Sequence, residues 1–180
     1  MADYFLETKR LRFRTWDAGD LDLARTLWGD ERVTKFIDAR GRLSDEMVQE
    51  RLDREIESGL VDGIQYWPIF LLEDDSFVGC CGLRSYDYNS RVMEIGAHIV
   101  YDYWGRKIAS EALVAVIKYS FVELSIYGLF AGHNPENQAS RALLKKLGFR
   151  YTHKEFYKPT GLMHPSYLMT VDDYRERLKK

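Results

Sequence analysis

The sequence has little cysteine: its two cysteines, Cys80 and Cys81, are adjacent within an apolar stretch. Neighbouring residues of a strand point to opposite faces of a sheet, so we expect two buried thiols rather than a disulfide. This usage excludes a disulfide framework and fits the reducing environment of the cytoplasm. We therefore expect a cytoplasmic protein.

Long apolar runs and a strong net charge are also missing. No run approaches the roughly 20 apolar residues that a membrane-spanning helix needs. The opening MADYFLETKRLRF lacks the apolar core of a signal peptide. The formal net charge of −2 indicates neither a nucleic acid nor a membrane surface as partner.

The histidines lack the spacing of metal ligands. His133, His153 and His164 have no i, i+4 partner and no neighbouring cysteine or carboxylate pattern. Metal sites are built from such clustered ligands, so we expect no metal.

A regular alternation of apolar stretches is present instead. With 180 residues, 46% of them hydrophobic, the chain suits one domain over residues 1–180. In the first half the pattern predicts strands at 8–15, 66–72, 77–86 and 91–100, and helices at 18–28 and after Ser44. In the second half it predicts a helix from about 107, a strand at 126–132, a helix from Asn137 to Gly148, strands at 149–157 and 163–171, and a short helix capped by Asp172. A strand–helix–strand unit flanked by hairpins indicates a mixed α/β fold with a mostly antiparallel sheet.

A glycine-containing turn joins the strand at 91–100 to the following helix. Its sequence is Trp104-Gly105-Arg106-Lys107-Ile108-Ala109. The first N–H groups of a helix have no partner within it, and the helix dipole attracts anions to that end. The cations Arg106 and Lys107 work against the dipole by roughly 0.3–1 kcal/mol each. Their presence there predicts an anionic ligand such as a phosphate.

Four segments stand in a characteristic order along the chain. They are LETKRLRFR at 6–14, EIGAHIVYDYWGRKIASEAL at 94–113, NQASRALLKKLGFR at 137–150, and the closing strand pair. In this order they resemble the GNAT superfamily of N-acetyltransferases, and within it the RimJ/RimL-like branch. The resemblance covers nearly the whole chain. It implies the acyl-CoA N-acyltransferase fold and acetyl-CoA as cosubstrate.

The phosphate loop of that family is usually Q/R-x-x-G-x-G/A, which falls here on residues 104–109. Trp104 stands where glutamine or arginine is commonest, and Lys107 replaces the central glycine. If φ at Lys107 is negative, its ammonium can contact phosphate; if φ is positive, cofactor binding is weakened. The resemblance implies that the loop through Ser110 holds the diphosphate, by residues Trp104, Gly105, Arg106, Lys107, Ile108, Ala109 and Ser110.

The resemblance also implies contacts for the rest of the cofactor. Backbone groups of His98, Ile99 and Val100 would meet the pantetheine arm and the thioester carbonyl. Asn137 would reach the pantetheine near the sulfur, although an asparagine there is also a helix N-cap. Ser140, one turn further, could protonate the leaving thiolate or be a solvated hydroxyl.

The remaining catalytic roles have several candidates. Glu94 and His98 share one strand face, and either could take the proton of the attacking amine. Their alternatives are a cross-strand pair with an arginine for Glu94 and a packed, hydrogen-bonded ring for His98. Tyr167 is a further candidate for the leaving-group acid, or a core residue. Glu111 is expected to be a cap or an ion pair, and Arg10, Arg12 and Arg14 to lie on a solvated strand face.

The resemblance thus implies transfer of the acetyl group of acetyl-CoA to a primary amine. The acceptor would be a protein N-terminus, an amino acid or a small amine. A CoA-binding module with weak catalysis is the alternative, because of Lys107, and an interaction domain without cofactor is a third. Residues 29–63 and 153–167, which would recognise the acceptor, carry charges of both signs and do not rank acceptors. Either a monomer or a homodimer is expected.

Overall fold

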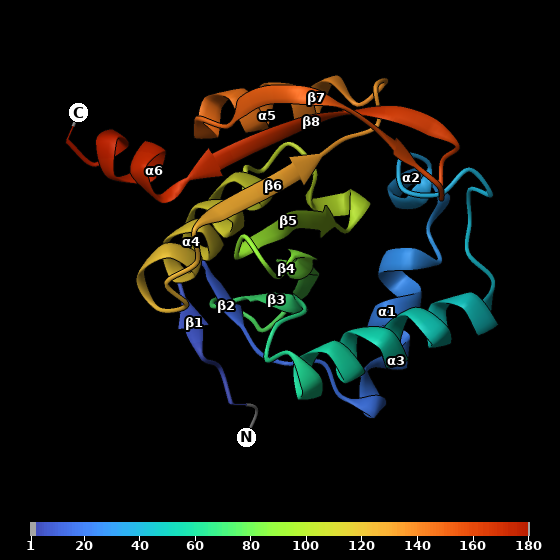
Figure 1. Ribbon diagram of the computed structural model, residues 1–180. Coiled ribbons are helices and arrows are strands. Elements are labelled where there is room, and N and C mark those ends of the chain that lie inside the picture. The colour runs from blue at the N-terminus through green and yellow to red at the C-terminus, as the bar shows by residue number, and fades with distance from the viewer. Residues whose placement is uncertain (1–2, 180) are drawn as a thin grey trace.

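Within residues 3–179, which the computed structural model describes, one mixed sheet runs in the order β1-β2-β3-β4-β5-β6-β8-β7 (Figure 1). Its strands are β1 Leu6–Glu7, β2 Leu11–Phe13, β3 Tyr66–Leu71, β4 Phe77–Asp87, β5 Val92–Ile99, β6 Gly128–Gly132, β7 Arg150–Tyr157 and β8 Leu162–Thr170. Neighbouring strands pair antiparallel except β5 and β6, which are parallel and joined by a helix. The predicted mixed, mostly antiparallel sheet with a central strand–helix–strand unit is confirmed.

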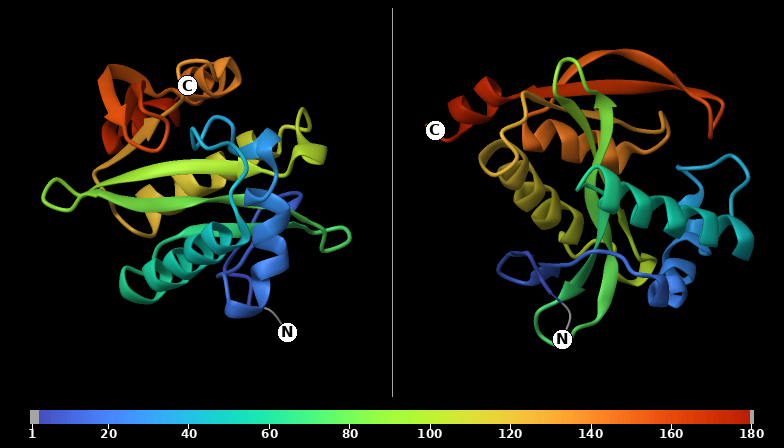
Figure 2. Two further views of the ribbon diagram at one scale, coloured as in Figure 1. Left: turned by 90° about the vertical axis from the view of Figure 1, so that its right-hand side faces the viewer. Right: turned by 60° about the horizontal axis from the view of Figure 1, so that its bottom comes forward.

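Helices cover both faces of this sheet. They are η1 Ala18–Asp20, α1 Leu21–Trp28, α2 Glu31–Thr34, α3 Asp45–Val61, η2 Tyr101–Tyr103, α4 Ile108–Val122, α5 Gln138–Leu147 and α6 Val171–Arg177. Figures 1 and 2 show α4 on one side of β4 and β5, and α1 and α3 on the other. No helix in the described part of the chain combines the length and apolarity that crossing a membrane requires.

The adjacent cysteines show how the two faces are separated. Both thiols are free and fully buried. Cys81 belongs to the apolar cluster that includes α4 and α5 residues, whereas Cys80 belongs to the cluster under α1 and α3. The prediction of two buried thiols on opposite faces is confirmed.

Two local predictions need correction, and one helix was missed. Of the strand expected at 8–15 only Leu11–Phe13 forms, because Thr8 closes a turn in which its Oγ1 accepts from Leu11 N at 2.9 Å. The last helix is capped by Thr170, in a capping box with Asp173, and Asp172 lies inside its first turn. The short helix α2 was not predicted, since Glu31–Thr34 is too brief for a periodic pattern.

The two parallel strands stay together for only three residue pairs. Their register joins 92–94 to 128–130, after which β5 continues beside β4 as far as Ile99 and β6 turns to β8. Val100 N donates to Val78 O at 3.0 Å. Since bonds alternate along an antiparallel pair, Ala97 and Ile99 direct their backbone groups away from β4. The divergence therefore opens a gap whose edge is backbone that β6 does not pair; of these groups, the Ile99 carbonyl accepts from Trp104 Nε1 at 2.8 Å.

Candidate active site

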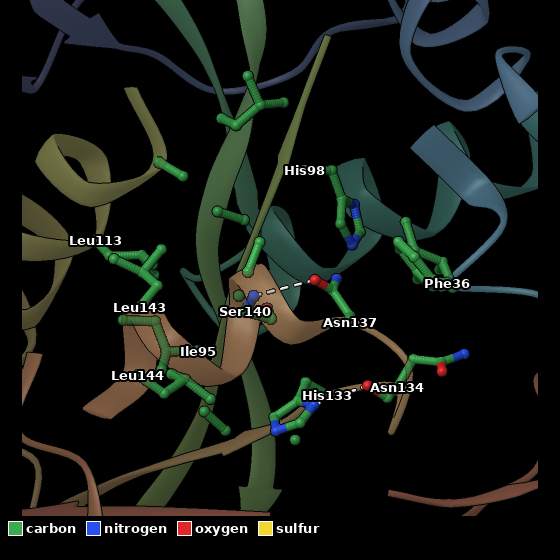
Figure 3. Close-up of a pocket in the computed structure, with 18 of the residues that line it drawn as sticks. Phe36, Ile95, His98, Leu113, His133, Asn134, Asn137, Ser140, Leu143 and Leu144 are labelled. Carbon is green, nitrogen blue, oxygen red and sulfur yellow. Dashed lines mark hydrogen bonds between the residues drawn. The ribbon is translucent and has the colours of Figure 1, made fainter. Parts of the chain in front are cut away.

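A cavity of roughly 790 Å³ lies where β5 and β6 diverge (Figure 3). Most predicted site residues line it: Glu94, His98, Ile99, Trp104, Gly105, Lys107, Ile108, Ala109, Ser110, Asn137 and Ser140. Val100, Arg106 and Tyr167 are absent from the lining. Arg106 lines a smaller neighbouring depression with Lys9 and Arg10. The structure thus brings together one strand, one loop and two helix starts that are far apart in the sequence.

The turn between β5 and α4 presents a row of free donors. Among the described residues, none accepts a hydrogen bond from the backbone N–H groups of residues 105–110. Gly105 and Lys107 both have positive φ, 75° and 62°. Two left-handed residues at a helix start turn successive N–H groups to the same side, which forms an anion-binding concavity.

Lys107 adopts the conformation that the sequence left open. Its φ of 62° lies in the left-handed region, which costs an L-residue with a Cβ about 1–2 kcal/mol. This is the alternative in which weaker cofactor binding is expected. Lys107 nonetheless lines the cavity, so its ammonium is available to an anion there.

Arg10 fixes the outer side of this turn. Its Nη1 and Nη2 each donate to Arg106 O at 3.2 Å, and its Nε pairs with Glu111 Oε2 at 2.7 Å. Glu111 also accepts from Thr8 Oγ1 at 2.7 Å. Burial opposes ionisation of Glu111, but the bonds from Thr8 and Arg10 outweigh it and lower its pKa. The ion pair predicted for Glu111 is confirmed.

Arg10 is exposed, as the prediction of a solvated arginine face requires, and it also binds Glu111 and the turn. The prediction is wrong for Arg14, whose side chain is 13% exposed and pairs with Asp20 at 2.6 Å. Alternation along a strand indicates which side chains leave the core. It does not indicate that a helix and a loop cover them.

His98 receives a hydrogen bond from a residue 70 positions away. Trp28 Nε1 lies 3.2 Å from His98 Nδ1, and because an indole N–H can only donate, Nδ1 must accept. Burial, with the nearby cations Arg51 and Arg84, lowers the pKa of His98 well below its usual value. The neutral ring therefore carries its hydrogen on Nε2. In this state His98 can donate a hydrogen bond from Nε2–H, but it has no free lone pair with which to act as a base.

Glu94 forms no ion pair with Arg84, the residue opposite it on the neighbouring strand. Arg84 is its direct partner in the β4–β5 register, but the Arg84 guanidinium pairs with Glu55 and lies 4.3 Å from the centre of the Tyr66 ring. Glu94 Oε1 accepts from Tyr66 Oη at 3.2 Å. Within residues 3–179 Glu94 forms no ion pair, so the cross-strand pair considered from the sequence is not present. Its carboxylate is open to the cavity.

The start of α5 supplies two polar groups to the opposite wall. Asn137 Oδ1 accepts from Ser140 N at 3.0 Å, which confirms the N-cap (Figure 3). The Ser140 hydroxyl forms no hydrogen bond with any residue of 3–179, and both side chains line the cavity. The helix ends at Gly148, with φ of 93°, as predicted.

Tyr167 lies behind the cavity wall rather than in it. It is 3% exposed, and its Oη is 3.4 Å from His133 Nε2. His133 Nδ1 is 2.8 Å from the carbonyl oxygen of Asn134, so Nδ1 carries the hydrogen and Nε2 accepts. Sequence reasoning missed His133 as a lining residue, since only its position just after β6 could have indicated it.

A second missed group lines the far end of the cavity. It contains aromatic side chains from several elements and one carboxylate: Phe36, Tyr66, Tyr86, Phe130, Phe156, Tyr157 and Glu155. No group of three or more histidine, cysteine or acidic side chains within residues 3–179 is arranged to hold a metal. The site therefore contains a donor-rich loop, an open gap between strands, the neutral His98 and the open carboxylate of Glu94, with Glu155 as a second carboxylate in the lining.

Comparison with known proteins identifies the family to which this chain belongs. The model for the acetyltransferase (GNAT) domain matches residues 10–150. The uncharacterized N-acetyltransferase p20 of Bacillus licheniformis is 27% identical over 168 residues, which are 92% of this chain and 94% of that protein. The uncharacterized N-acetyltransferase YnaD of Bacillus subtilis is 28% identical over 145 residues, 81% of this chain and 82% of that protein.

Solved structures of acetyltransferases share the fold. A GNAT-family acetyltransferase from Bacillus anthracis superposes with a TM-score of 0.80 at 23% identity, covering 93% of this chain and 99% of that one. RimL, a ribosomal L7/L12 alpha-N-protein acetyltransferase in complex with coenzyme A, gives a TM-score of 0.80 at 16% identity, covering 95% and 99%. At these identities the likeness establishes the fold alone.

Proposed function

Because this chain belongs to the GNAT acetyltransferase family, we propose that it transfers the acetyl group of acetyl-CoA to a primary amine by direct attack on the thioester. A protein N-terminus, an amino acid and a small amine are the acceptors that the sequence resemblance implies. The observation that carries the proposal is the row of six backbone N–H groups, residues 105–110, without acceptors among the described residues. These donors lie beside the gap between β5 and β6.

The chain has groups for each part of the cofactor. The N–H groups of the turn and the Lys107 ammonium would hold the diphosphate. The backbone groups of Ala97 and the N–H of Ile99 would run beside the pantetheine arm, whereas the Ile99 carbonyl already accepts from Trp104 Nε1 at 2.8 Å. Asn137 lies across the gap from them. An N–H donor of this strand edge would also meet the negative charge that develops on the thioester oxygen. Val100 N is already bonded to Val78 O, so Ile99 is the better candidate for that role.

Glu94 is the base in this proposal. An amine arrives mostly protonated at neutral pH, and a positioned base contributes about 10²–10⁴-fold to the rate. Glu94 has an open carboxylate, whereas His98 uses its only lone pair to accept from Trp28. Glu94 therefore takes the proton, directly or through a water, and His98 offers Nε2–H to the reacting groups.

The leaving thiolate needs a proton in return. Ser140 lines the cavity with an unpaired hydroxyl and is the first candidate. Tyr167 is the weaker candidate, because its hydroxyl lies behind the His133 ring, and the Nδ1 hydrogen of that ring is held by the carbonyl oxygen of Asn134. An ammonium loses two protons on becoming the amide: Glu94 takes the first and passes it to water, and the second, lost from the tetrahedral intermediate, balances the proton that reaches the sulfur.

A CoA-binding module with weak transfer is the second candidate. The positive φ of Lys107 favours it, because a Cβ stands where the family usually has glycine. Heating with and without acetyl-CoA, followed by thiol release over a panel of amines, separates the two. Acetyl-CoA at 100 times its Kd should add about 2.7 kcal/mol to the free energy of unfolding. A stabilised protein that releases no thiol with any amine would support the module; no stabilisation would contradict both.

A further inference from the structure

The charged side chains of the cavity are separated by sign. The lysines and carboxylates among its lining residues are Lys107, Lys146, Glu94 and Glu155. Both cations come from the turn and α5, where the proposed function places the cofactor. Both carboxylates come from strands, β5 and β7. No arginine lines the cavity, and the nearby Arg84 is paired with Glu55.

A continuous aromatic wall connects the two carboxylates. Glu94 lies opposite Phe130 in the β5–β6 register. The Phe130 ring stacks on Tyr86 with centroids 3.9 Å apart and planes inclined by 9°. Tyr86 Oη donates to Glu155 Oε2 at 2.9 Å. The wall therefore runs from the reacting carboxylate to a second carboxylate near the opening.

Glu155 keeps one oxygen for a ligand. Its Oε2 receives Tyr86 and lies 3.4 Å from His153 Nε2, on an exposed histidine. Its Oε1 has no hydrogen-bond partner among residues 3–179. Burial, and after it the bond to Glu155, raises the pKa of Tyr86 to about 12, so the phenol remains a donor at physiological pH. Tyr86 thus holds Glu155 in place without neutralising it.

Building on the proposed function, we propose that the acceptor carries a second positive charge, which Glu155 binds while Glu94 receives the reacting ammonium. A carboxylate beside aromatic rings binds ammonium and guanidinium groups through charge, hydrogen bonds and cation–π contact. An acceptor with a distal carboxylate would be repelled by Glu155, and the two lysines of the lining come from the turn and α5 rather than from the strands that carry the carboxylates. The acceptor class is therefore a diamine or an amine next to a basic side chain.

Three amines with the same number of carbon atoms, four, test this inference. 1,4-Diaminobutane, butylamine and 4-aminobutyrate carry a positive, a neutral and a negative distal group, and CoA release gives kcat/KM for each. The three differ in intrinsic basicity, so the measured quantity is the diaminobutane-to-butylamine ratio in each variant relative to the same ratio in the native protein. Glu155→Gln removes the charge but keeps an oxygen for Tyr86. Asp75→Asn is the matched control, because Asp75 accepts from Tyr4 Oη at 2.7 Å on the exposed surface, outside the cavity.

We expect the native protein to prefer diaminobutane and to use 4-aminobutyrate least. Glu155→Gln should lower the ratio at least about tenfold, equivalent to about 1.4 kcal/mol, and Asp75→Asn should not. An unchanged ratio in Glu155→Gln overturns the inference. The inference is also overturned if none of the three amines causes CoA release although acetyl-CoA raises the Tm. That result would leave cofactor binding intact. No rise in Tm with acetyl-CoA would instead contradict the proposed function itself.

Discussion

The indole N–H of Trp28 donates to Nδ1 of His98 across 3.2 Å, from a helix on one face of the sheet to the edge of the central gap. In the proposed mechanism, this contact favours Glu94 over His98, the other candidate base on that strand face. It occupies the lone pair that His98 would need and leaves Glu94 as the open carboxylate. The Cys80 sulfur, 3.8 Å from the same nitrogen, adds no strong donor or acceptor there.

Replacing the two candidates should therefore have different effects. Glu94→Gln removes the base and should lower kcat by about 10²-fold or more, with the Kd for CoA nearly unchanged. His98→Gln keeps an N–H donor and should lower kcat less than His98→Phe, which has none. Steady-state kinetics at saturating acetyl-CoA, with CoA binding by calorimetry, measure both quantities. If His98→Gln lost as much as Glu94→Gln, the histidine would be acting as the base.

The lowered pKa of His98 makes part of the stability depend on pH. Below the usual value of 6.5 the unfolded chain binds a proton at this residue, while the folded protein does not. The free energy of unfolding should therefore fall as pH decreases below 6.5, by roughly 1 kcal/mol for this group at pH 5.5. Urea unfolding at pH 7.5 and 5.5 should show a smaller fall for His98→Gln than for the native protein. Equal falls would mean that His98 is protonated in the fold.

Lys107 strains the turn but helps to hold an anion, so two substitutions should separate these effects. Lys107→Gly removes the left-handed Cβ and should raise the free energy of unfolding by about 1 kcal/mol. Lys107→Glu places a carboxylate against the diphosphate and should weaken CoA binding.

Ser125→Gly is the matched control for Lys107, because Ser125 has a φ of 50° and lies outside the cavity. It should change stability in the same direction and leave CoA binding unaltered. Calorimetric titration with CoA reports the binding effect. Native affinity in Lys107→Glu would mean that this turn does not hold the diphosphate.

Arg10 should matter for the cofactor although it does not line the main cavity. Arg10→Lys can keep the ion pair with Glu111, but a single ammonium cannot also reproduce the two bonds to Arg106 O. We expect CoA binding to weaken several-fold, with little change in Tm. Arg12→Lys, two residues further along the chain and paired with Asp75, should bind CoA like the native protein. Equal affinities in the two variants would show that the Arg10 contact does not position the turn.

Local signals in the sequence predicted most elements and most of the lining residues. Asn137 and Gly148 marked the ends of α5 because an N-cap and a left-handed C-cap are local requirements. The turn at residues 104–109 was predicted from its own glycine and charges, and by the family resemblance.

What the sequence did not predict depends on contacts between distant residues. The neutral tautomer of His98 requires Trp28, and the Arg10 clamp requires Glu111, 101 positions away. The carboxylate at the far end of the cavity is placed by Tyr86 and β7, which meet only after the sheet forms. The φ of Lys107 was also undetermined, because a lysine is compatible with either sign until the loop is closed on both sides.

The central claim is that the backbone N–H groups of residues 105–110 hold the diphosphate of the cofactor. Titration of ¹⁵N-labelled protein with CoA, followed by amide chemical shifts, tests it directly. We predict that the largest shifts fall on these amides, with smaller ones at Ala97 and Ile99. Saturation with CoA that leaves the amides of residues 105–110 unshifted would contradict the account.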